Sequence, residues 1–400
     1  MGSTSTGTGK TAIQKRRVVI SGYYGYRNSG DEAVLKSILF ALQEEGARQG
    51  VSIVPVVLSI DPAWTSEMYG VEAVHRMRLG EVIRAIRSSD GLISGGGSLL
   101  QDATGIKTIP YYTGVLRLAQ LLRKPTFVYA QGIGPVNRRW MDRLIRGVMR
   151  RSAYISVRDA ESAALLGRMG VPHDRIDVVP DPVMGLPLPT APGLGGAGAG
   201  AAGTAAAPGG GEAASPAAER LPVVGVSLRH WRKDGADLAR AAAALGALAR
   251  SRAVRLRFLP FHTPSDAEAS RWVLGQLGDL GASVAEIAEP GDDPQQMLLE
   301  VSRCDVLFGM RLHALIYAAN QSVPMLGLSY DPKIDQFLNR IGLTPVGTTE
   351  SLEPAIFASA AIKLLDKPEE WLQTHRSAID KLKQEARRPA QQISALLRQS

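Results

Sequence analysis

The sequence has one cysteine, few aromatic residues and no long apolar run, and each shortage excludes a class of protein. The lone thiol, Cys304, cannot form an intramolecular disulfide or a cysteine zinc cluster. No apolar stretch approaches the roughly 20 residues of a membrane-spanning helix, and the amino terminus lacks the apolar segment of a signal peptide. We therefore expect a cytoplasmic protein. No pair of residues has metal-site spacing, so we expect no metal.

The composition is that of a soluble globular protein with an affinity for anions. The chain has 400 residues, enough for two domains, with 45% hydrophobic and 21% charged residues. Its net charge of +8 favours anionic partners. Aromatic residues make up only 6%, and no nucleic-acid-binding module is present, so we expect no nucleic acid. A membrane surface and phosphorylated small molecules remain as alternatives.

Apolar strand-like runs alternate with amphipathic helix-like segments, a pattern that predicts parallel sheets covered by helices on both faces. Residues 1–15 are rich in Gly, Ser and Thr and are expected to be a disordered tail. Residues 190–219 are almost entirely Ala, Gly and Pro, so we expect a linker or insertion there. The pattern predicts an α/β protein with two Rossmann-type, doubly wound domains, at 16–189 and 220–400, facing across a cleft.

Three glycine-rich loops follow predicted strands of the first domain. The first, at 22–32, reads GYYGYRNSGDE; its acids would repel a phosphate, whereas carboxylates and tyrosines suit a sugar. The alternative is that Asn28, Asp31 and Glu32 only cap and stabilise the next helix. The other loops read SGGGSLLQD at 94–102 and AQGIGP at 130–135. Because glycines allow close approach of the backbone, we expect a binding edge, made by Tyr23, Tyr24, Asn28, Asp31, Glu32, Gly96, Gly97, Ser98, Gln101, Asp102 and Gln131.

Basic side chains follow three predicted strands of the second domain. Arg229 ends the run at 223–228, Arg311 and His313 follow 306–309, and Lys333 follows 324–328. Ligands of open α/β sheets bind outside the carboxyl ends of strands, where helix amino termini add N–H donors. Each residue alone could be a solvated charge or a structural histidine. Their joint placement favours a site for a small polyanion, with His313 able to move a proton near neutral pH.

An arginine-rich segment lies at 138–151, carrying Arg138, Arg139, Arg143, Arg146, Arg150 and Arg151. Its apolar positions have helical spacing. Such a helix usually packs on a sheet and turns its arginines to water. The alternative is docking on anionic lipid headgroups.

Five stretches resemble the polysaccharide pyruvyl transferase family, closely its bacterial members that pyruvylate secondary cell wall polysaccharide. They are the three glycine-rich loops at 22–32, 94–102 and 130–135, with MRLHALIYAA at 310–319 and SYDPKIDQF at 329–337. The resemblance implies a GT-B-like fold, with an acceptor-binding first domain and a donor-binding second domain. It implies phosphoenolpyruvate as donor and a 4,6-ketal on N-acetylmannosamine. The acceptor would be carried on a polyprenyl diphosphate lipid, which suits an enzyme at the inner face of the plasma membrane. Pyruvylated polysaccharide anchors surface-layer proteins. The segment at 190–219 has no expected counterpart in the family.

The chemistry expected of the site follows from this donor. Arg229, Arg311 and Lys333, with the Leu312 and His313 backbone at a helix start, would hold phosphate and carboxylate. His313 is the expected general acid toward the methylene carbon, and Lys333 assists phosphate departure. No cofactor is expected, because phosphoenolpyruvate is a substrate. The rival hypotheses are a nucleotide-sugar glycosyltransferase of the same architecture and a non-catalytic glycan-binding module.

Overall fold

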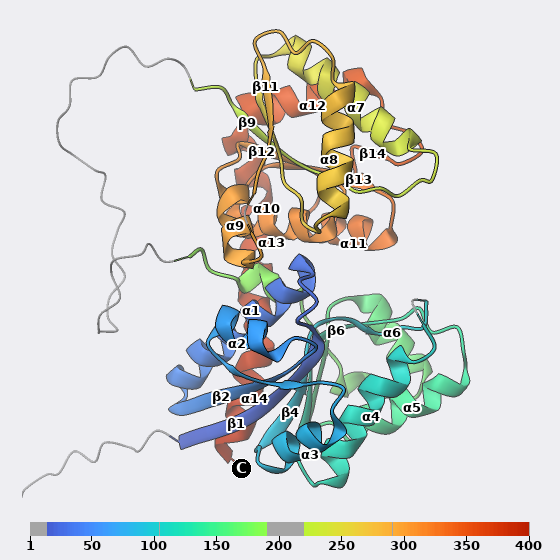
Figure 1. Cartoon of the computed structure of the whole chain (residues 1–400), viewed down its shortest axis with the longest axis vertical. Coiled ribbons are helices and arrows are strands. Elements are labelled where there is room, and N and C mark those ends of the chain that lie inside the picture. Colours follow the sequence, from blue (N-terminus) through green and yellow to red (C-terminus); the bar gives the residue numbers. More distant parts are fainter. Residues whose placement is uncertain (1–13, 104, 190–219, 290, 400) are drawn as a thin grey trace, which may run out of the picture.

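The computed structural model describes residues 14–103, 105–189, 220–289 and 291–399. The expected tail, apart from its last two residues, and the expected linker lie outside these residues. The chain folds into two layered α/β units, one above the other (Figure 1). No helix in the described ranges combines the length and apolarity needed to cross a bilayer.

The first unit is built on a parallel sheet of eight strands, counted over the described residues, in the order β3-β2-β1-β4-β6-β7-β8, with β5 beside β6. The strands are β1 Gln14–Tyr24, β2 Val51–Ser59, β3 Glu72–His75, β4 Gly91–Ser94, β5 Gly97–Leu100, β6 Thr126–Ile133, β7 Tyr154–Val157 and β8 Asp177–Val178. The helices are α1 Ser29–Arg48, α2 Pro62–Tyr69, α3 Leu79–Arg87, α4 Thr108–Leu121, α5 Trp140–Met149 and α6 Ala160–Arg168, followed by the short helices η1 His173–Arg175 and η2 Pro182–Gly185.

The second unit has a parallel sheet of six strands, again within the described part of the chain, in the order β11-β10-β9-β12-β13-β14. The strands are β9 Val223–Ser227, β10 Arg255–Phe258, β11 Val284–Ile287, β12 Val306–Gly309, β13 Met325–Ser329 and β14 Gly347–Thr348. The helices are α7 Ala236–Ser251, α8 Ser265–Gln276, α9 Pro294–Ser302, α10 Leu312–Gln321, α11 Pro332–Arg340, α12 Pro354–Asp366, α13 Pro368–Ala386 and α14 Arg388–Gln399. The predicted pair of doubly wound parallel-sheet domains is confirmed.

Strand register brings the loops of each sheet to one edge. Ser21 of β1 pairs with Ser94 of β4, and Gly309 of β12 pairs with both Ser227 of β9 and Gly327 of β13. Parallel strands that end in register release their following loops side by side. The glycine-rich loops of the first domain therefore meet at one edge, and the loops bearing Arg229, Arg311 and Lys333 meet at another.

The two domains are joined through η2 and the last two helices. Asn320 of α10 donates hydrogen bonds to the carbonyls of Val183 (2.7 Å) and Leu186 (2.9 Å), so α10 is tied to η2. Helix α14 lies in the sequence range expected for the second domain, but it packs against α1, β2 and β6 of the first. Its side chains Ile393 and Leu397 are fully buried there. Burying such side chains contributes roughly 1.5–3 kcal/mol each, so the chain end holds the domains together.

Helices cover both faces of the first sheet. Helices α3, α4, α5 and α6 share one apolar cluster with the sheet, whereas α1 contributes to a second cluster that continues into α10 and α13. This second cluster crosses from one domain to the other. The beginnings of α1 and α10 are consequently brought together in the cleft.

Candidate functional site

The centre of the cleft is a contact between the first turns of α1 and α10. Asn28 caps α1, and its side chain accepts hydrogen bonds from the Gly30 and Asp31 amides. The next helical residue, Gly30, lies against His313: a β-carbon on Gly30 would stand 2.6 Å from Cε1 and Nδ1 of the imidazole. Ser29 adds a hydrogen bond to the Phe261 carbonyl across the same gap. Glycine at position 30 is therefore what allows the two helix starts to meet.

His313 is enclosed but incompletely paired. Its Nε2 lies 3.8 Å from Oδ2 of Asp181, too far for a hydrogen bond, and has no hydrogen-bond partner in the structure. Burial lowers the pKa of His313; Asp181 opposes this shift, while Arg158 and Arg311 add to it. Burial thus favours the neutral form of the imidazole, and its Nε2 is a buried ring nitrogen without a hydrogen-bond partner among the described residues.

Arg158, which the sequence analysis did not select, connects the two domains beside His313. Its guanidinium donates from Nη2 to the Ser98 hydroxyl at 2.7 Å and from Nη1 to Asp181 at 3.5 Å. Its carbonyl accepts from Nη1 of Arg340 at 3.0 Å. Arg158 therefore links a glycine-rich loop of the first domain to α11 of the second.

A small hollow lies next to this arginine, and we call it the Lys333 hollow. Three cationic and two carboxylate side chains line it, together with apolar groups: Arg158, Lys333, Arg340, Asp159, Asp181, Leu312 and Phe337 among them. Its volume is about 40 Å³, room for a few water molecules. Burial, followed by the neighbouring Arg158, lowers the pKa of Lys333. The excess of cations over carboxylates makes the hollow a place for an anion.

Asp31 lies on the first-domain side of this group. Burial raises its pKa from 3.8 to about 7, with Glu32 and Asp181 adding to the shift and Arg158 opposing it. Gly97 has a φ of +92°, and a β-carbon there would stand 2.9 Å from Oδ1 of Asp31. The triple-glycine loop thus approaches the carboxylate closely, as a loop with side chains could not. A carboxylate of this pKa can accept a proton near neutral pH.

Arg229 lies at the same edge of the second sheet, in an aromatic setting. It donates from Nη1 to the Tyr330 hydroxyl at 2.9 Å, and its Cζ stands 5.4 Å and 5.2 Å from the Trp231 and Tyr330 ring centroids. Its buried Nε has no hydrogen-bond partner in the structure. The guanidinium is therefore held in place with donor capacity to spare.

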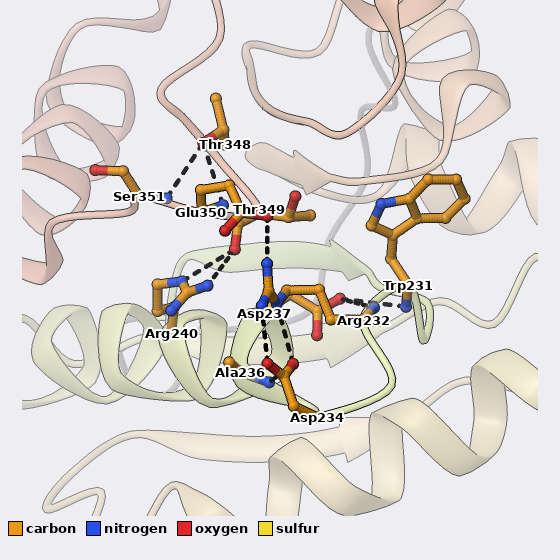
Figure 2. A network of polar contacts seen from close by, with 10 residues as sticks. All are labelled: Trp231, Arg232, Asp234, Ala236, Asp237, Arg240, Thr348, Thr349, Glu350 and Ser351. Carbon is orange, nitrogen blue, oxygen red and sulfur yellow. Dashed lines mark hydrogen bonds and ion pairs between the residues drawn. The ribbon is translucent and has the colours of Figure 1, made fainter.

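A polar network fixes the loop that carries Arg229 (Figure 2). Asp237 accepts hydrogen bonds from the amides of Trp231 (3.2 Å) and Arg232 (3.3 Å). Arg232 pairs with Asp234 and Glu350, and Arg240 donates to the Thr349 carbonyl at 3.0 Å. The β9–α7 loop is thereby tied to the loop after β14.

We expected Arg311 to hold the phosphate or carboxylate of phosphoenolpyruvate, but its guanidinium pairs with a carboxylate of its own domain. Its Nε donates to Oδ2 of Asp266 at 2.9 Å, and Nη2 contacts the other oxygen of the same fully buried carboxylate. A forked pair of this kind uses the face of the guanidinium that would otherwise grip a ligand. In this structure, Arg311 ties the beginning of α10 to α8.

Several predicted acceptor residues are used inside the first domain. Glu32 is fully buried and accepts from the Gly25 amide (2.8 Å) and the Tyr69 hydroxyl (2.8 Å). Asp102 accepts from Asn137 and Arg138; burial alone would raise its pKa, but these hydrogen bonds hold it below the ordinary value. Tyr24 and Gln131 are fully buried, and the Tyr24 hydroxyl and Gln131 Nε2 have no hydrogen-bond partner among the described residues. In this structure, the carboxylates of Glu32 and Asp102 are occupied by contacts within the first domain.

Tyr23 is the predicted acceptor residue that presents an exposed ring. It stacks on Tyr26 at 3.9 Å with the two planes 4° apart, and both rings are about two-fifths exposed (39% and 41%). Arg76 lies 5.7 Å from the Tyr26 ring and donates to the Gly22 carbonyl at 2.8 Å, which holds the loop. A stacked aromatic surface at the cleft suits a sugar face.

A larger cavity of about 300 Å³ lies between the two domains, beside the beginning of α1. Its walls come from both domains, with Arg27 and Ser29 facing the loops after β10 and β11. Apolar groups such as Phe261, Ile287 and Met297 line it together with charged ones. The junction between the domains therefore carries two hollows, one small and cationic and one roomier and mixed.

Of the predicted site residues, the structure gathers His313, Lys333, Leu312, Ser98 and Asp31 around Arg158 and Asp181. Arg229 lies at the same edge of the second sheet, beside the rings of Trp231 and Tyr330. Of the additional residues, Arg158 directly follows the buried strand β7, whereas Asp181 lies three residues after β8, which is itself partly exposed. A polar residue directly after a buried strand is the signal that would have found Arg158, and Asp181 has no such local signal.

Comparison with known proteins gives both a family and a set of similar folds. A family model described as polysaccharide pyruvyl transferase matches residues 28–332. No curated protein matches the chain at significant similarity.

Solved structures with a similar fold include UDP-GlcNAc 2-epimerases and a protein bound to UDP-glucose. UDP-GlcNAc 2-epimerase from Methanocaldococcus jannaschii is 10% identical, with a TM-score of 0.61 over 97% of this chain and 100% of that one. The same enzyme from Neisseria meningitidis, bound to UDP-GlcNAc, is 11% identical, with a TM-score of 0.56 over 97% and 100%. HepE from Anabaena, in complex with UDP-glucose, is 12% identical, with a TM-score of 0.53 over 95% and 98%. These likenesses confirm the predicted GT-B-like fold.

Proposed function

The chain belongs to the polysaccharide pyruvyl transferase family, and we propose that it moves the pyruvyl group of phosphoenolpyruvate onto a cell wall glycan as a ketal. The observation that carries this proposal is the position of His313 beside Asp181, a carboxylate that lines the cationic Lys333 hollow at the domain junction. The site pairs a titratable imidazole with a pocket for an anion. Both are needed to protonate an enol phosphate and release its phosphate.

The Lys333 hollow is the proposed place for the donor phosphate. Arg158, Lys333 and Arg340 supply charge-assisted donors, and Arg229 is available for the carboxylate. The hollow of about 40 Å³ is smaller than phosphoenolpyruvate. Binding therefore requires the Lys333 and Arg340 side chains to move apart, and the incoming anion replaces the repulsion between these cations by attraction.

His313 is the proposed acid. Its Nε2 gives a proton to the methylene carbon, the π electrons form the new C–H bond, and C2 becomes cationic. A sugar hydroxyl adds to C2, the C2–O bond to phosphate breaks, and the second hydroxyl closes the ketal ring. The two hydroxyl protons balance the new methyl hydrogen and the proton on phosphate. Because the bound donor is a polyanion, it raises the pKa of His313 and so charges the acid when substrate arrives.

Asp31 is the proposed base for the acceptor hydroxyl. Its pKa of about 7 makes it half ionised near neutrality. The Gly97 backbone lies close against it, so a glycine-rich loop borders the carboxylate, and Tyr23 offers a ring to the sugar face. This arrangement supports a glycan in the first-domain loops, and Asp31 is the residue there whose chemistry matches the reaction.

The acceptor that we propose is N-acetylmannosamine, ketalated at positions 4 and 6, on a polyprenyl-diphosphate-linked glycan. This part of the proposal derives from the five sequence stretches shared with the bacterial cell wall enzymes. It would place the protein in the cytoplasm, at the inner face of the plasma membrane, where its product would serve surface-layer anchoring.

The test is phosphate release from phosphoenolpyruvate with a synthetic lipid-linked N-acetylmannosaminyl acceptor, followed by mass analysis of the sugar. We expect stoichiometric phosphate and a product heavier by one pyruvyl ketal. Release of nucleoside diphosphate from a nucleotide sugar, with no use of phosphoenolpyruvate, would instead assign the glycosyltransferase activity. Binding of the glycan without either reaction would show that the protein is a non-catalytic glycan-binding module.

A further inference from the structure

Helix α5 of the first domain carries a continuous stripe of exposed arginines. Arg139, Arg143, Arg146 and Arg150 stand at i, i+4, i+7 and i+11, so they lie on one side of the helix. All four are exposed, and none makes an ion pair with any described acidic residue. Asp142 is the one acidic residue within α5. Four arginines with one carboxylate beside them keep a net repulsion, which is unfavourable unless an anionic surface faces the stripe.

Two large apolar side chains flank this stripe. Trp140 and Leu144, one turn apart, are 51% and 38% exposed. They are not needed for the core, because α5 already buries Met141, Ile145, Val148 and Met149 against the sheet. An exposed tryptophan beside arginines has the composition of a helix that lies at a membrane–water interface.

The neighbouring helix extends the same surface. Gln120 of α4 donates to the Val148 carbonyl at 2.9 Å, which sets the end of α4 against α5. Leu121, the last residue of α4, is 64% exposed, and Arg117 one turn earlier is exposed as well. The combination of basic and apolar groups therefore spans two helices on the outer layer of the first domain.

We propose that the α5 face, made of Arg139, Trp140, Arg143, Leu144, Arg146 and Arg150, binds the surface of an anionic phospholipid bilayer. The arginines attract lipid phosphates, and Trp140 and Leu144 enter the headgroup region. Nucleic acid would satisfy the arginines but not the apolar pair. Arg138, directly before α5, contacts Asp102 of a glycine-rich loop at 3.3 Å. Docking by this face therefore brings the acceptor loops close to the lipid surface.

Cosedimentation with vesicles tests the proposal, comparing phosphatidylglycerol–phosphatidylcholine mixtures with pure phosphatidylcholine. We expect binding to the mixed vesicles only, weakening as salt is raised. Each basic residue near such a surface contributes on the order of fivefold in affinity. The R139E/R143E/R146E variant should therefore lose at least roughly 100-fold.

A matched control has the same charge change elsewhere: K363E/R376E/K381E on exposed residues of α12 and α13. It should retain most of the binding. The W140S/L144S variant keeps every charge, and it should bind the mixed vesicles about tenfold more weakly or worse. It serves as a second test if the triple variant does not fold.

Equal binding by the α5 variants and the control would overturn the proposal. So would a triple variant that loses affinity for an oligonucleotide but not for vesicles, because the face would then serve nucleic acid. Turnover of phosphoenolpyruvate with a water-soluble acceptor is measured in parallel. It should be unchanged in the α5 variants, so failure of the membrane proposal is distinguishable from failure of the proposed reaction.

Discussion

The imidazole of His313 in the second domain lies directly on Gly30 in the first, where a β-carbon would be 2.6 Å from the ring. This contact joins the beginnings of α1 and α10 at the junction between the domains. Because Gly30 of the first domain packs against the imidazole of His313, the position of this proposed acid depends on how the two domains meet.

Replacing Gly30 by alanine should therefore displace His313. We expect kcat to fall by at least about tenfold, since catalytic geometry tolerates shifts of only a fraction of an ångström. The control is Gly114→Ala in α4, where no atom of the described residues lies within 4 Å of the added carbon. That change should preserve activity and stabilise the protein by about 0.5–1 kcal/mol. Full activity of the Gly30→Ala variant would show that the contact does not position the acid.

Replacing His313 by asparagine tests the acid itself. Positioned general acids contribute roughly 10²–10⁴-fold, so kcat should fall by at least about 100-fold. Donor affinity, measured by calorimetry with phosphoenolpyruvate, should change only a few fold, because the hollow is lined by other residues. Turnover near that of the unmodified protein would reject the assignment.

Arg158 should act mainly on donor binding. The Arg158→Gln variant removes a cation from the Lys333 hollow and releases Ser98 and Asp181, so KM for phosphoenolpyruvate should rise at least about tenfold. Arg168→Gln, on an exposed arginine at the end of α6, is the matched control and should leave KM unchanged. Identical KM values in the two variants would remove Arg158 from the donor site.

The raised pKa of Asp31 predicts that both activity and stability depend on pH. The base must be ionised, so kcat/KM should rise through about pH 7, and this limb should disappear in Asp31→Asn. The folded-state pKa is raised, so the protonated form stabilises the fold at low pH and this contribution is lost as pH rises through 7. The Tm advantage of Asp31→Asn should therefore grow between about pH 4 and 7, by a few degrees, and then level off.

A constant difference in Tm across this range, measured by scanning calorimetry, would contradict the raised pKa. A pH limb that persists in the asparagine variant would assign it to another group. The two measurements are independent, because one follows folding and the other follows turnover.

Much of the fold could be predicted from the sequence because the strands are buried on both faces. The run at β12 is a continuous apolar segment, and its predicted bounds, 306–309, agree with the structure. Strand β5 was missed because Gly97 and Ser98 have low strand propensity, and its pairing with β6 becomes apparent only in the folded sheet. The packing of α14 on the first domain depends on tertiary contacts that no local pattern encodes.

The candidate site was predictable only in part for a related reason. His313 and Lys333 follow strands that the apolar pattern marks clearly. The forked pairing of Arg311 with Asp266, by contrast, joins residues 45 positions apart. Glu32 and Asp102 have the sequence appearance of ligand residues, but their hydrogen bonds hold loops in place. Which polar residues face the cleft is decided by this tertiary pairing, because buried polar groups must find partners.

The most direct test of the account is transfer from phosphoenolpyruvate in D₂O, with the carbon-bound hydrogens of the product sugar counted by mass spectrometry. We predict one pyruvyl ketal per acceptor, with a single deuterium in its methyl group, and at least about a 100-fold slower reaction with His313→Asn. An unlabelled methyl group, or equal rates for the two proteins, would contradict proton delivery by His313 at the domain junction.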